Sequence, residues 1–193
     1  MIYEWKHEGH IRNFGDALHE VLVPQKQHYE WYVDTKNMHF LLGSVIDNNI
    51  IKHTLQQGYR PVFHGCGWRG NPLNEDLVQQ CDFIGVRGPH TQEELARCGI
   101  DTIVTKDPAY QLPHIIAPGV PNGMALVVRH LLDDTETTPN TIHELKADAT
   151  FRPTVEDRQD IIEFVQKISG ARFVLAGAMH AAITAHAYGV PFA

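Results

Sequence analysis

The stretch RFVLAGAMHAAITAHAYGVPFA, from Arg172 to Ala193, decides the fold that we expect. RFVLAG is an apolar run of strand length that ends in glycine, and an alanine-rich segment with helical composition follows it. VPFA then resembles the beginning of another strand. A strand that leads into a helix and on to a further strand is typical of a parallel sheet with helices on both faces.

The same alternation of strands and helices extends back through the chain. Apolar runs of strand length occur at MIYEW, HFLLGS, RPVFHGC, CDFIGVR, DTIVTKDP and MALVVRH. Between them, NFGDALHEVL, IDNNIIKHTLQQG, TQEELARCG and TVEDRQDIIEFVQKISG carry apolar residues at helical spacing. The sequence therefore predicts an α/β protein with parallel sheets.

Polar residues at fixed spacing predict where several helices begin. Asn13 or Asp16 can cap the helix in NFGDALHEVL. Thr91 with Glu94 has the spacing of a capping box, and 154–157 carries a variant of that box.

A linker is expected at 112–123, LPHIIAPGVPNG, because its three prolines and two glycines suit neither a helix nor a central strand. It would separate an N-terminal Rossmann-like domain, residues 1–111, from a C-terminal one, residues 124–193. A parallel sheet needs a covering helix after VPFA, so we expect the second domain to be incomplete, or truncated, at Ala193.

Composition excludes several classes of function. The 193 residues carry a net charge of −7 without clustered cations, which argues against nucleic-acid binding. The three cysteines form no C-x-x-C pair, and the 13 histidines are scattered, so we expect neither a disulfide framework nor a metal site. Because no apolar run approaches the roughly 20 residues of a membrane span, and the start lacks a signal-peptide pattern, we expect a cytoplasmic protein.

The loop HGCGWRG matches G-x-G-x-x-G at Gly65, Gly67 and Gly70, so a dinucleotide site must be weighed. In that fingerprint a helix opens directly after the glycines, whereas Asn71 and Pro72 follow them here. An acidic residue is also expected at the end of the next strand, where this sequence has Arg87. The pattern favours a tight turn that lets a ligand or another loop approach the backbone.

His180 falls in the first turn of the helix expected after RFVLAG. The backbone N–H groups of that turn have no intrahelical partner, and together with the helix dipole they attract anions. The imidazole either helps to hold a phosphate or carboxylate and exchanges a proton, or it fills a pocket in the fold. The residues alone leave both interpretations open.

The chain resembles the polysaccharide pyruvyl transferases, and within them the branch of ketal pyruvyltransferases of exopolysaccharide synthesis. The motifs that carry the resemblance occur in order as NFGDAL, LLGSVID, HGCGWRG, FIGVRGPHTQEELARCGI, DPAYQL and AMHAAITAHAYGVPFA. The resemblance implies a fold similar to GT-B glycosyltransferases, with an N-terminal domain on the acceptor side and a C-terminal domain on the donor side. It also implies transfer of the enolpyruvyl part of phosphoenolpyruvate onto two hydroxyls of a saccharide or lipid-linked saccharide, with a cyclic ketal as product and no separate cofactor.

The resemblance also assigns roles to residues of this sequence. His180 matches the family's functional histidine, as general acid and phosphate contact. Arg87 matches an arginine that binds the phosphoenolpyruvate anion, and Arg129, after ALVV, is a second candidate for that clamp. Surface arginines at strand ends are the alternative for both.

The first loop and two further sites have divided interpretations. Asn13 and Gly15 match the family's loop on the acceptor side, and Asp16 beside them is either the base that takes the sugar proton or a helix cap. Asp107 is either a base or a turn former before Pro108. We expect Gly65 and Gly67 to bring backbone close to the substrate; the chemistry requires no metal.

Two departures from the family keep other functions open. Met179 stands where many members carry an arginine, and members continue beyond the GVP motif. The chain would then be a truncated product, complete its sheet through another subunit as a homo-oligomer, or retain the fold without turnover. The alternatives are a nucleotide-sugar glycosyltransferase of GT-B type and an inactive saccharide-binding or assembly protein.

Overall fold

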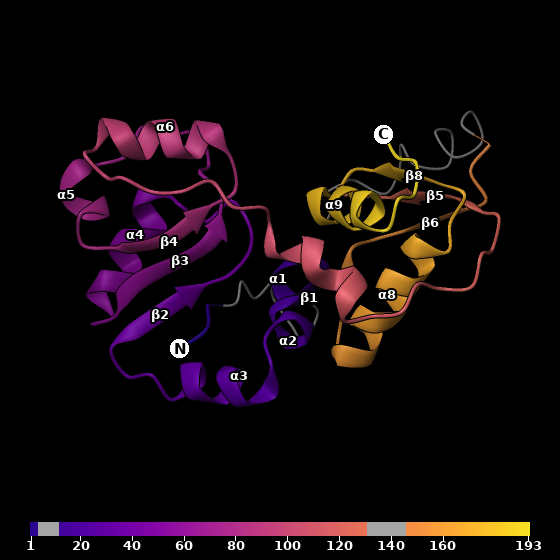
Figure 1. Ribbon diagram of the computed structural model, residues 1–193, viewed down its shortest axis with the longest axis horizontal. Coiled ribbons are helices and arrows are strands. Elements are labelled where there is room, and N and C mark those ends of the chain that lie inside the picture. The colour runs from indigo at the N-terminus through magenta and orange to yellow at the C-terminus, as the bar shows by residue number, and fades with distance from the viewer. Residues whose placement is uncertain (4–11, 131–145) are drawn as a thin grey trace. The chain divides into compact units, whose positions relative to one another are not determined.

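The computed structural model describes residues 1–3, 12–130 and 146–193, and the chain forms two compact units (Figure 1). Unit 1 consists of Met1–Glu4 and Val23–Pro108, and unit 2 of Trp5–Leu22 and Ala109–Ala193. Both units contain a parallel sheet with helices packed on it, which confirms the α/β prediction. No helix in the described part of the chain is long and apolar enough to cross a membrane.

Unit 1 is built on a three-stranded parallel sheet with the order β2-β3-β4. Its strands are β2 (Asn37–Phe40), β3 (Arg60–Cys66) and β4 (Asp82–Val86). Single parallel bridges extend both edges, from Ile2 to His39 and from Val104 to Val86. The strands predicted at MIYEW and DTIVTKDP are therefore reduced to these bridges in the described residues, and Glu4 and Trp5 lie outside them.

The core of unit 1 lies on one face of this sheet. Phe40, Phe63 and Phe83 stack across the three strands, with ring centroids 4.8 and 5.2 Å apart. Helices pack Ile51, Val78 and Leu95 into the same cluster. These helices are α4 (Asn48–Gln56), α5 (Glu75–Val78) and α6 (Pro89–Arg97), and α3 (Gln25–Tyr32) precedes β2.

The capping box predicted at Thr91 and Glu94 is wrong. Helix α6 begins at Pro89, whose fixed φ suits the first helical position, so both residues lie inside the helix. The Thr91 hydroxyl accepts a hydrogen bond from Trp68 N at 3.1 Å, and the Glu94 carboxylate accepts one from Leu73 N at 3.0 Å. The two side chains hold the loop after β3 instead of starting α6.

Unit 2 contains a second parallel sheet, with the order β6-β5-β8. Its strands are β5 (Ala125–Val128), β6 (Ala149–Phe151) and β8 (Phe173–Ala176). Phe192 forms a parallel bridge to Val174, so a further strand position follows β8, as VPFA predicts. A short antiparallel ribbon joins β1 (Arg12–Asn13) to β7 (Thr154–Val155).

The helices of unit 2 include a long one whose N-terminus is doubly capped. They are α1 (Phe14–Ala17), α2 (His19–Leu22), the 3-10 helix η1 (Pro108–His114), α8 (Arg158–Ser169) and α9 (Met179–Ala187). Asp157 caps α8 by accepting a hydrogen bond from Asp160 N at 3.0 Å, and the Asp160 carboxylate accepts one from Glu156 N at 2.9 Å. Thr154 lies in β7 and Asp157 is itself the cap, so the box predicted at 154–157 is wrong and the capping pair lies three residues later, at Asp157 and Asp160.

The units divide the chain differently from the predicted ranges 1–111 and 124–193. The Phe14 ring stacks on Phe164 of α8 at 4.0 Å, and Phe14 N donates to Pro153 O, so the NFGD motif packs in unit 2. The segment predicted as a linker also packs there. A Cβ at Gly119 would lie 2.0 Å from the Gln166 carbonyl oxygen of α8.

The phenylalanine stack predicts a large loss of stability for Phe63→Ala. Phe63 is fully buried between two other rings, and such truncations cost about 3 to 5 kcal/mol. Ile103→Ala is the control, since Ile103 is exposed in the same unit and its truncation should cost less than about 0.5 kcal/mol. Urea unfolding followed by circular dichroism compares the two, and equal costs would contradict this account of the core.

Candidate functional site

In unit 2 the chain goes from the central strand β5 to β6 on one side and then to β8 on the other side. This change of direction is a topological switch point. β6 and β8 lie on opposite sides of β5, and ligands of open parallel sheets bind at the carboxyl ends of strands at such a point. Arg129 follows β5 and Gly177 follows β8 at this edge. Gly177 N donates to Val128 O at 2.7 Å, and a Cβ on Gly177 would lie 2.9 Å from His130 N. A glycine is therefore needed where the two strand ends meet.

His180 lies just beyond this edge, as the sequence predicts. It is the second residue of α9, in the first turn after Ala178, and the residue is only 7% exposed. Ala178 makes no side-chain capping hydrogen bond, and Ala181 N donates to Ala178 O at 3.0 Å within the turn. A helix N-terminus without a side-chain cap is a common place for an anion to bind.

Asn13, Gly15 and His180, which are far apart in the sequence, come together in unit 2. Asn13 caps α1 by accepting hydrogen bonds from Gly15 N at 2.8 Å and Asp16 N at 3.4 Å. The backbone of Gly15 then lies so close to the imidazole that a Cβ would be 2.1 Å from Nδ1 of His180. The cap is thus Asn13 rather than Asp16, and Gly15 forms one wall of the space that holds the His180 ring.

Arg129 is buried rather than a surface residue at a strand end. The residue is 9% exposed, and its backbone N–H donates to Phe151 O at 3.0 Å, which extends the ladder between β5 and β6. The side chain of Arg129 therefore leaves the backbone at the same edge of the sheet as the turn that carries His180.

The other predicted residues gather in unit 1, around Arg87. The guanidinium donates to Asp107 Oδ2 at 3.1 Å and to Ser44 Oγ at 2.7 Å. A Cβ at Gly67 would lie 2.5 Å from the guanidinium, so this glycine makes room for Arg87. Asp107 is 2% exposed, and its carboxylate is engaged in the ion pair.

Gly65 has a similar structural use. Its φ is +71°, in the left-handed region that favours glycine, and a Cβ there would lie 2.9 Å from the Pro108 ring. No helix opens directly after this loop, because the next one, α5, begins at Glu75. Another loop of unit 1, at Pro108, therefore approaches the backbone of the glycine loop. The sequence had left open whether a ligand or another loop would do so.

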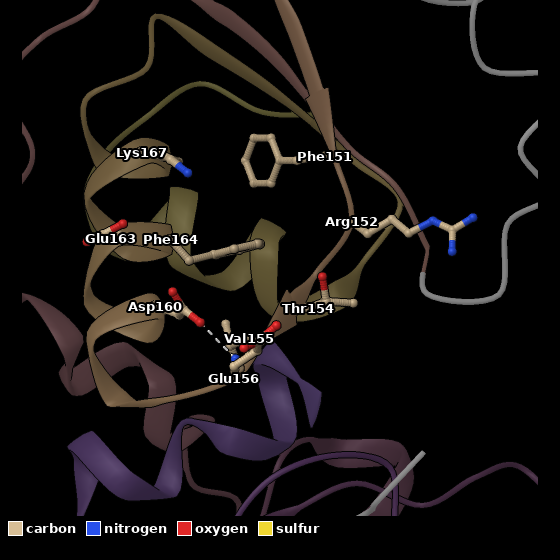
Figure 2. A pocket seen from close by; sticks show the side chains of 9 residues that line it. All are labelled: Phe151, Arg152, Thr154, Val155, Glu156, Asp160, Glu163, Phe164 and Lys167. Atoms are coloured by element: carbon tan, nitrogen blue, oxygen red, sulfur yellow. Dashed lines mark hydrogen bonds between the residues drawn. The ribbon is translucent and has the colours of Figure 1, made fainter. Parts of the chain in front are cut away.

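A pocket that the sequence did not indicate lies between β7 and α8 in unit 2 (Figure 2). It has a volume of about 280 Å³, and its lining combines Phe151 and Phe164 with charged side chains. The charged members are Arg152, Glu156, Asp160, Glu163 and Lys167. Among the described residues, no three or more His, Cys, Asp or Glu side chains are arranged to hold a metal ion.

The contact of Gly15 with His180 predicts strong coupling between substitutions at the two positions. In the wild-type background, Gly15→Ala forces the ring to move and should cost on the order of 1 to 3 kcal/mol. In a His180→Ala background the space is empty, and alanine in α1 should even stabilise by up to about 1 kcal/mol. Urea unfolding of all four proteins measures the coupling, and additive costs would contradict it.

The Arg87–Asp107 pair predicts a large cost for losing its carboxylate. Asp107→Ala leaves a mostly buried guanidinium without its counter-charge and should cost about 3 to 5 kcal/mol. The exposed pair Arg60–Asp82 provides a matched control in the same unit, since Asp82→Ala should cost less than about 1 kcal/mol. Urea unfolding compares both variants, and similar costs would show that burial does not decide the difference.

Comparison with protein families gives a match over most of the chain. No curated protein matches the chain. The family model described as polysaccharide pyruvyl transferase matches residues 34–193, which covers β2 to β4 of unit 1 and the whole sheet of unit 2 with the turn that carries His180. The chain therefore belongs to the polysaccharide pyruvyl transferase family.

Proposed function

We propose that this chain transfers the pyruvyl group of phosphoenolpyruvate to two hydroxyls of a saccharide and forms a cyclic ketal. Family membership supports pyruvyl transfer to a polysaccharide. The observation that carries the proposal is the position of His180, in the first turn of α9 at the switch point of the unit 2 sheet. There a proton donor lies beside backbone N–H groups suited to a phosphate.

The reaction has three requirements that residues must meet. The methylene carbon of phosphoenolpyruvate gains a proton and becomes a methyl group. The bond from C2 to the phosphate oxygen breaks, and phosphate leaves with the electron pair. Two acceptor oxygens bond to C2, and each loses its proton. One of these two protons compensates for the proton that the methyl group gained, and the other leaves with phosphate. The site must therefore donate a proton, hold two anionic groups and stabilise positive charge at C2.

Unit 2 contains groups suited to these requirements. We assign His180 as the general acid and as a contact to phosphate, together with the N–H groups of the first turn of α9. Arg129, at the same edge of the sheet, is the proposed partner of the carboxylate or phosphate, because a guanidinium binds either in bidentate fashion. Gly15 keeps the His180 ring in place.

The proposal depends less on Arg87 and on Asp107. Each already neutralises the charge of the other in the ion pair, and Ser44 takes a further hydrogen bond of the guanidinium. For Arg87 to bind phosphoenolpyruvate, the substrate must compete with a carboxylate held 3.1 Å away.

Calorimetric titration with phosphoenolpyruvate tests the proposal. Wild-type protein should bind it, and His180→Ala should weaken binding by at least about 10-fold, since a charge-assisted hydrogen bond contributes about 1.5 to 3 kcal/mol. His186→Ala is the matched control, because His186 is exposed on the same helix and its ring lies edge-on to Tyr110 and Phe192.

UDP-sugars are the comparison ligand in the same titration. If a UDP-sugar binds and phosphoenolpyruvate does not, His180 serves a nucleotide sugar and the glycosyltransferase alternative replaces the proposal. If neither ligand binds to a folded wild-type protein, the chain is a saccharide-binding or assembly protein without this reaction.

A further inference from the structure

The pocket between β7 and α8 of unit 2 takes no part in the reaction steps proposed above (Figure 2). Its volume of about 280 Å³ is close to the lower limit of ligand pockets, which is about 300 Å³. A single sugar ring is a ligand of that size. The chemistry of the lining then decides which kind of ligand suits the pocket.

Two phenylalanines form an apolar corner of the pocket. The rings of Phe151 and Phe164 meet at an angle of 81°, with centroids 5.1 Å apart. Phe164 is buried and also stacks on Phe14 at 4.0 Å, so the fold holds this ring in place. Phe151, the last residue of β6, is only half-buried. It therefore keeps apolar surface that a ligand can cover.

Polar groups of α8 lie beside this corner. Asp160 Oδ2 accepts a hydrogen bond from Glu156 N at 2.9 Å. Glu163 Oε1 accepts one from Gln159 Nε2 at 3.2 Å. Within the described part of the chain, the second oxygen of each carboxylate accepts no hydrogen bond, and Lys167 forms no ion pair. In Figure 2 the side chains of Glu163 and Lys167 extend from successive turns of α8.

The charges of the lining favour a neutral ligand with hydroxyl groups. Three carboxylates outnumber two cationic side chains, so an anion such as phosphoenolpyruvate would meet net negative charge. A metal ion is not favoured either, because no suitable group of three His, Cys, Asp or Glu side chains occurs in the residues described. A sugar ring has C–H groups on its faces and hydroxyls around its rim. Its face can pack on an aromatic ring while its hydroxyls bond to carboxylates and an ammonium.

The pocket is connected to the proposed catalytic turn through contacts within unit 2. β6 ends at Phe151, so the pocket begins at the carboxyl edge of the sheet, the edge from which the turn with His180 also leaves. Phe164 in the pocket wall stacks on Phe14, and the next residue, Gly15, lies against the His180 ring. Direct packing thus joins the pocket wall to His180.

We propose that this pocket is a saccharide subsite, which holds one sugar ring of the acceptor while another ring of the same saccharide reacts at His180. The inference rests on the proposed function. The face of the bound sugar packs on Phe151. Its hydroxyls donate hydrogen bonds to Asp160 and Glu163 and accept one from Lys167. Because the rings of a saccharide are linked, binding one of them raises the effective concentration of the other at the catalytic turn.

Amide proton–nitrogen NMR spectra of the whole chain test the subsite without any turnover. The ligands to titrate are the methyl glycosides of glucose, galactose and mannose, and the disaccharides lactose and cellobiose. At least one of them should shift the amide signals of residues 151–167 in a saturable manner. The proposal is overturned if none of these sugars shifts those signals, or if the shifts lie only elsewhere in the chain.

Two substitutions on the exposed side of α8 remove the proposed hydrogen bonds and leave the phenylalanine corner intact. Glu163→Gln and Lys167→Gln should each weaken sugar binding by about 10-fold, since each loses a hydrogen bond to a charged group. Arg158→Gln is the matched control, because Arg158 is exposed on the same helix and lies outside the pocket lining. Sugar affinities equal to that of the control would contradict the subsite.

Titration of the same proteins with phosphoenolpyruvate separates this inference from the proposed function. Glu163→Gln and Lys167→Gln should bind phosphoenolpyruvate as the wild type does, because its proposed site is at His180 and Arg129. Sugar binding at residues 151–167 without phosphoenolpyruvate binding overturns the proposed function and, with it, the acceptor role of the pocket. Phosphoenolpyruvate binding without sugar shifts at residues 151–167 leaves pyruvyl transfer standing and overturns only the subsite.

Discussion

The close approach of the Gly15 backbone to the His180 ring is the constraint on which the candidate site in unit 2 depends. A side chain of any size at Gly15 would occupy the space of the imidazole. The approach requires α1 to be held against α9, which the β1–β7 ribbon and the stacking of Phe14 on Phe164 accomplish. Asn13 then closes the turn that presents the glycine. A motif near the start of the chain thereby determines where a ring near its end can lie.

In unit 1 a side chain also approaches a glycine closely, but there the approach makes room for an ion pair. Arg87 at the end of β4 meets Asp107 and Ser44, and Gly67 leaves the space that its guanidinium fills. Gly65 and Gly67 of HGCGWRG are thus explained by contacts inside the protein. Their resemblance to a dinucleotide fingerprint arises because close approach of any group to backbone, whether a phosphate or an arginine, favours glycine.

The sequence predicted the elements well wherever local pattern decides them. Apolar runs predicted β2 to β5 and β8, and the turn after RFVLAG predicted the place of His180. The capping box at Thr91 failed because the Gly88–Pro89 pair starts the helix earlier, so the same side chains bind a distant loop. The strand at DTIVTKDP was reduced to one bridge at the edge of a sheet, where no second neighbour extends the pairing.

Contacts between distant segments could not be predicted in the same way. The NFGD motif joins unit 2 through antiparallel pairing with residues near 155, and periodicity contains no information about such pairing. The ion pair of Arg87 with Asp107 likewise depends on which strands are neighbours and in what register. The same holds for the hydrogen bonds that join Asp34, His39 and His64. The sequence contained His39 and His64, but only the register of the sheet brings their rings within hydrogen-bond distance.

The strand order of unit 1 has a consequence for how its two faces are used. Strands that follow one another in chain order, joined by right-handed crossovers, place every connecting helix on the same side of the sheet. That side holds the phenylalanine stack under α4, α5 and α6. The crossovers between β2 and β4 therefore contribute no helix to the opposite side. There Trp31 of α3 stacks on the polar rings of His39 and His64, and Ile84 of β4 is 58% exposed. Winding in one direction thus divides the sheet into a face that holds the apolar core of unit 1 and a face that holds polar rings.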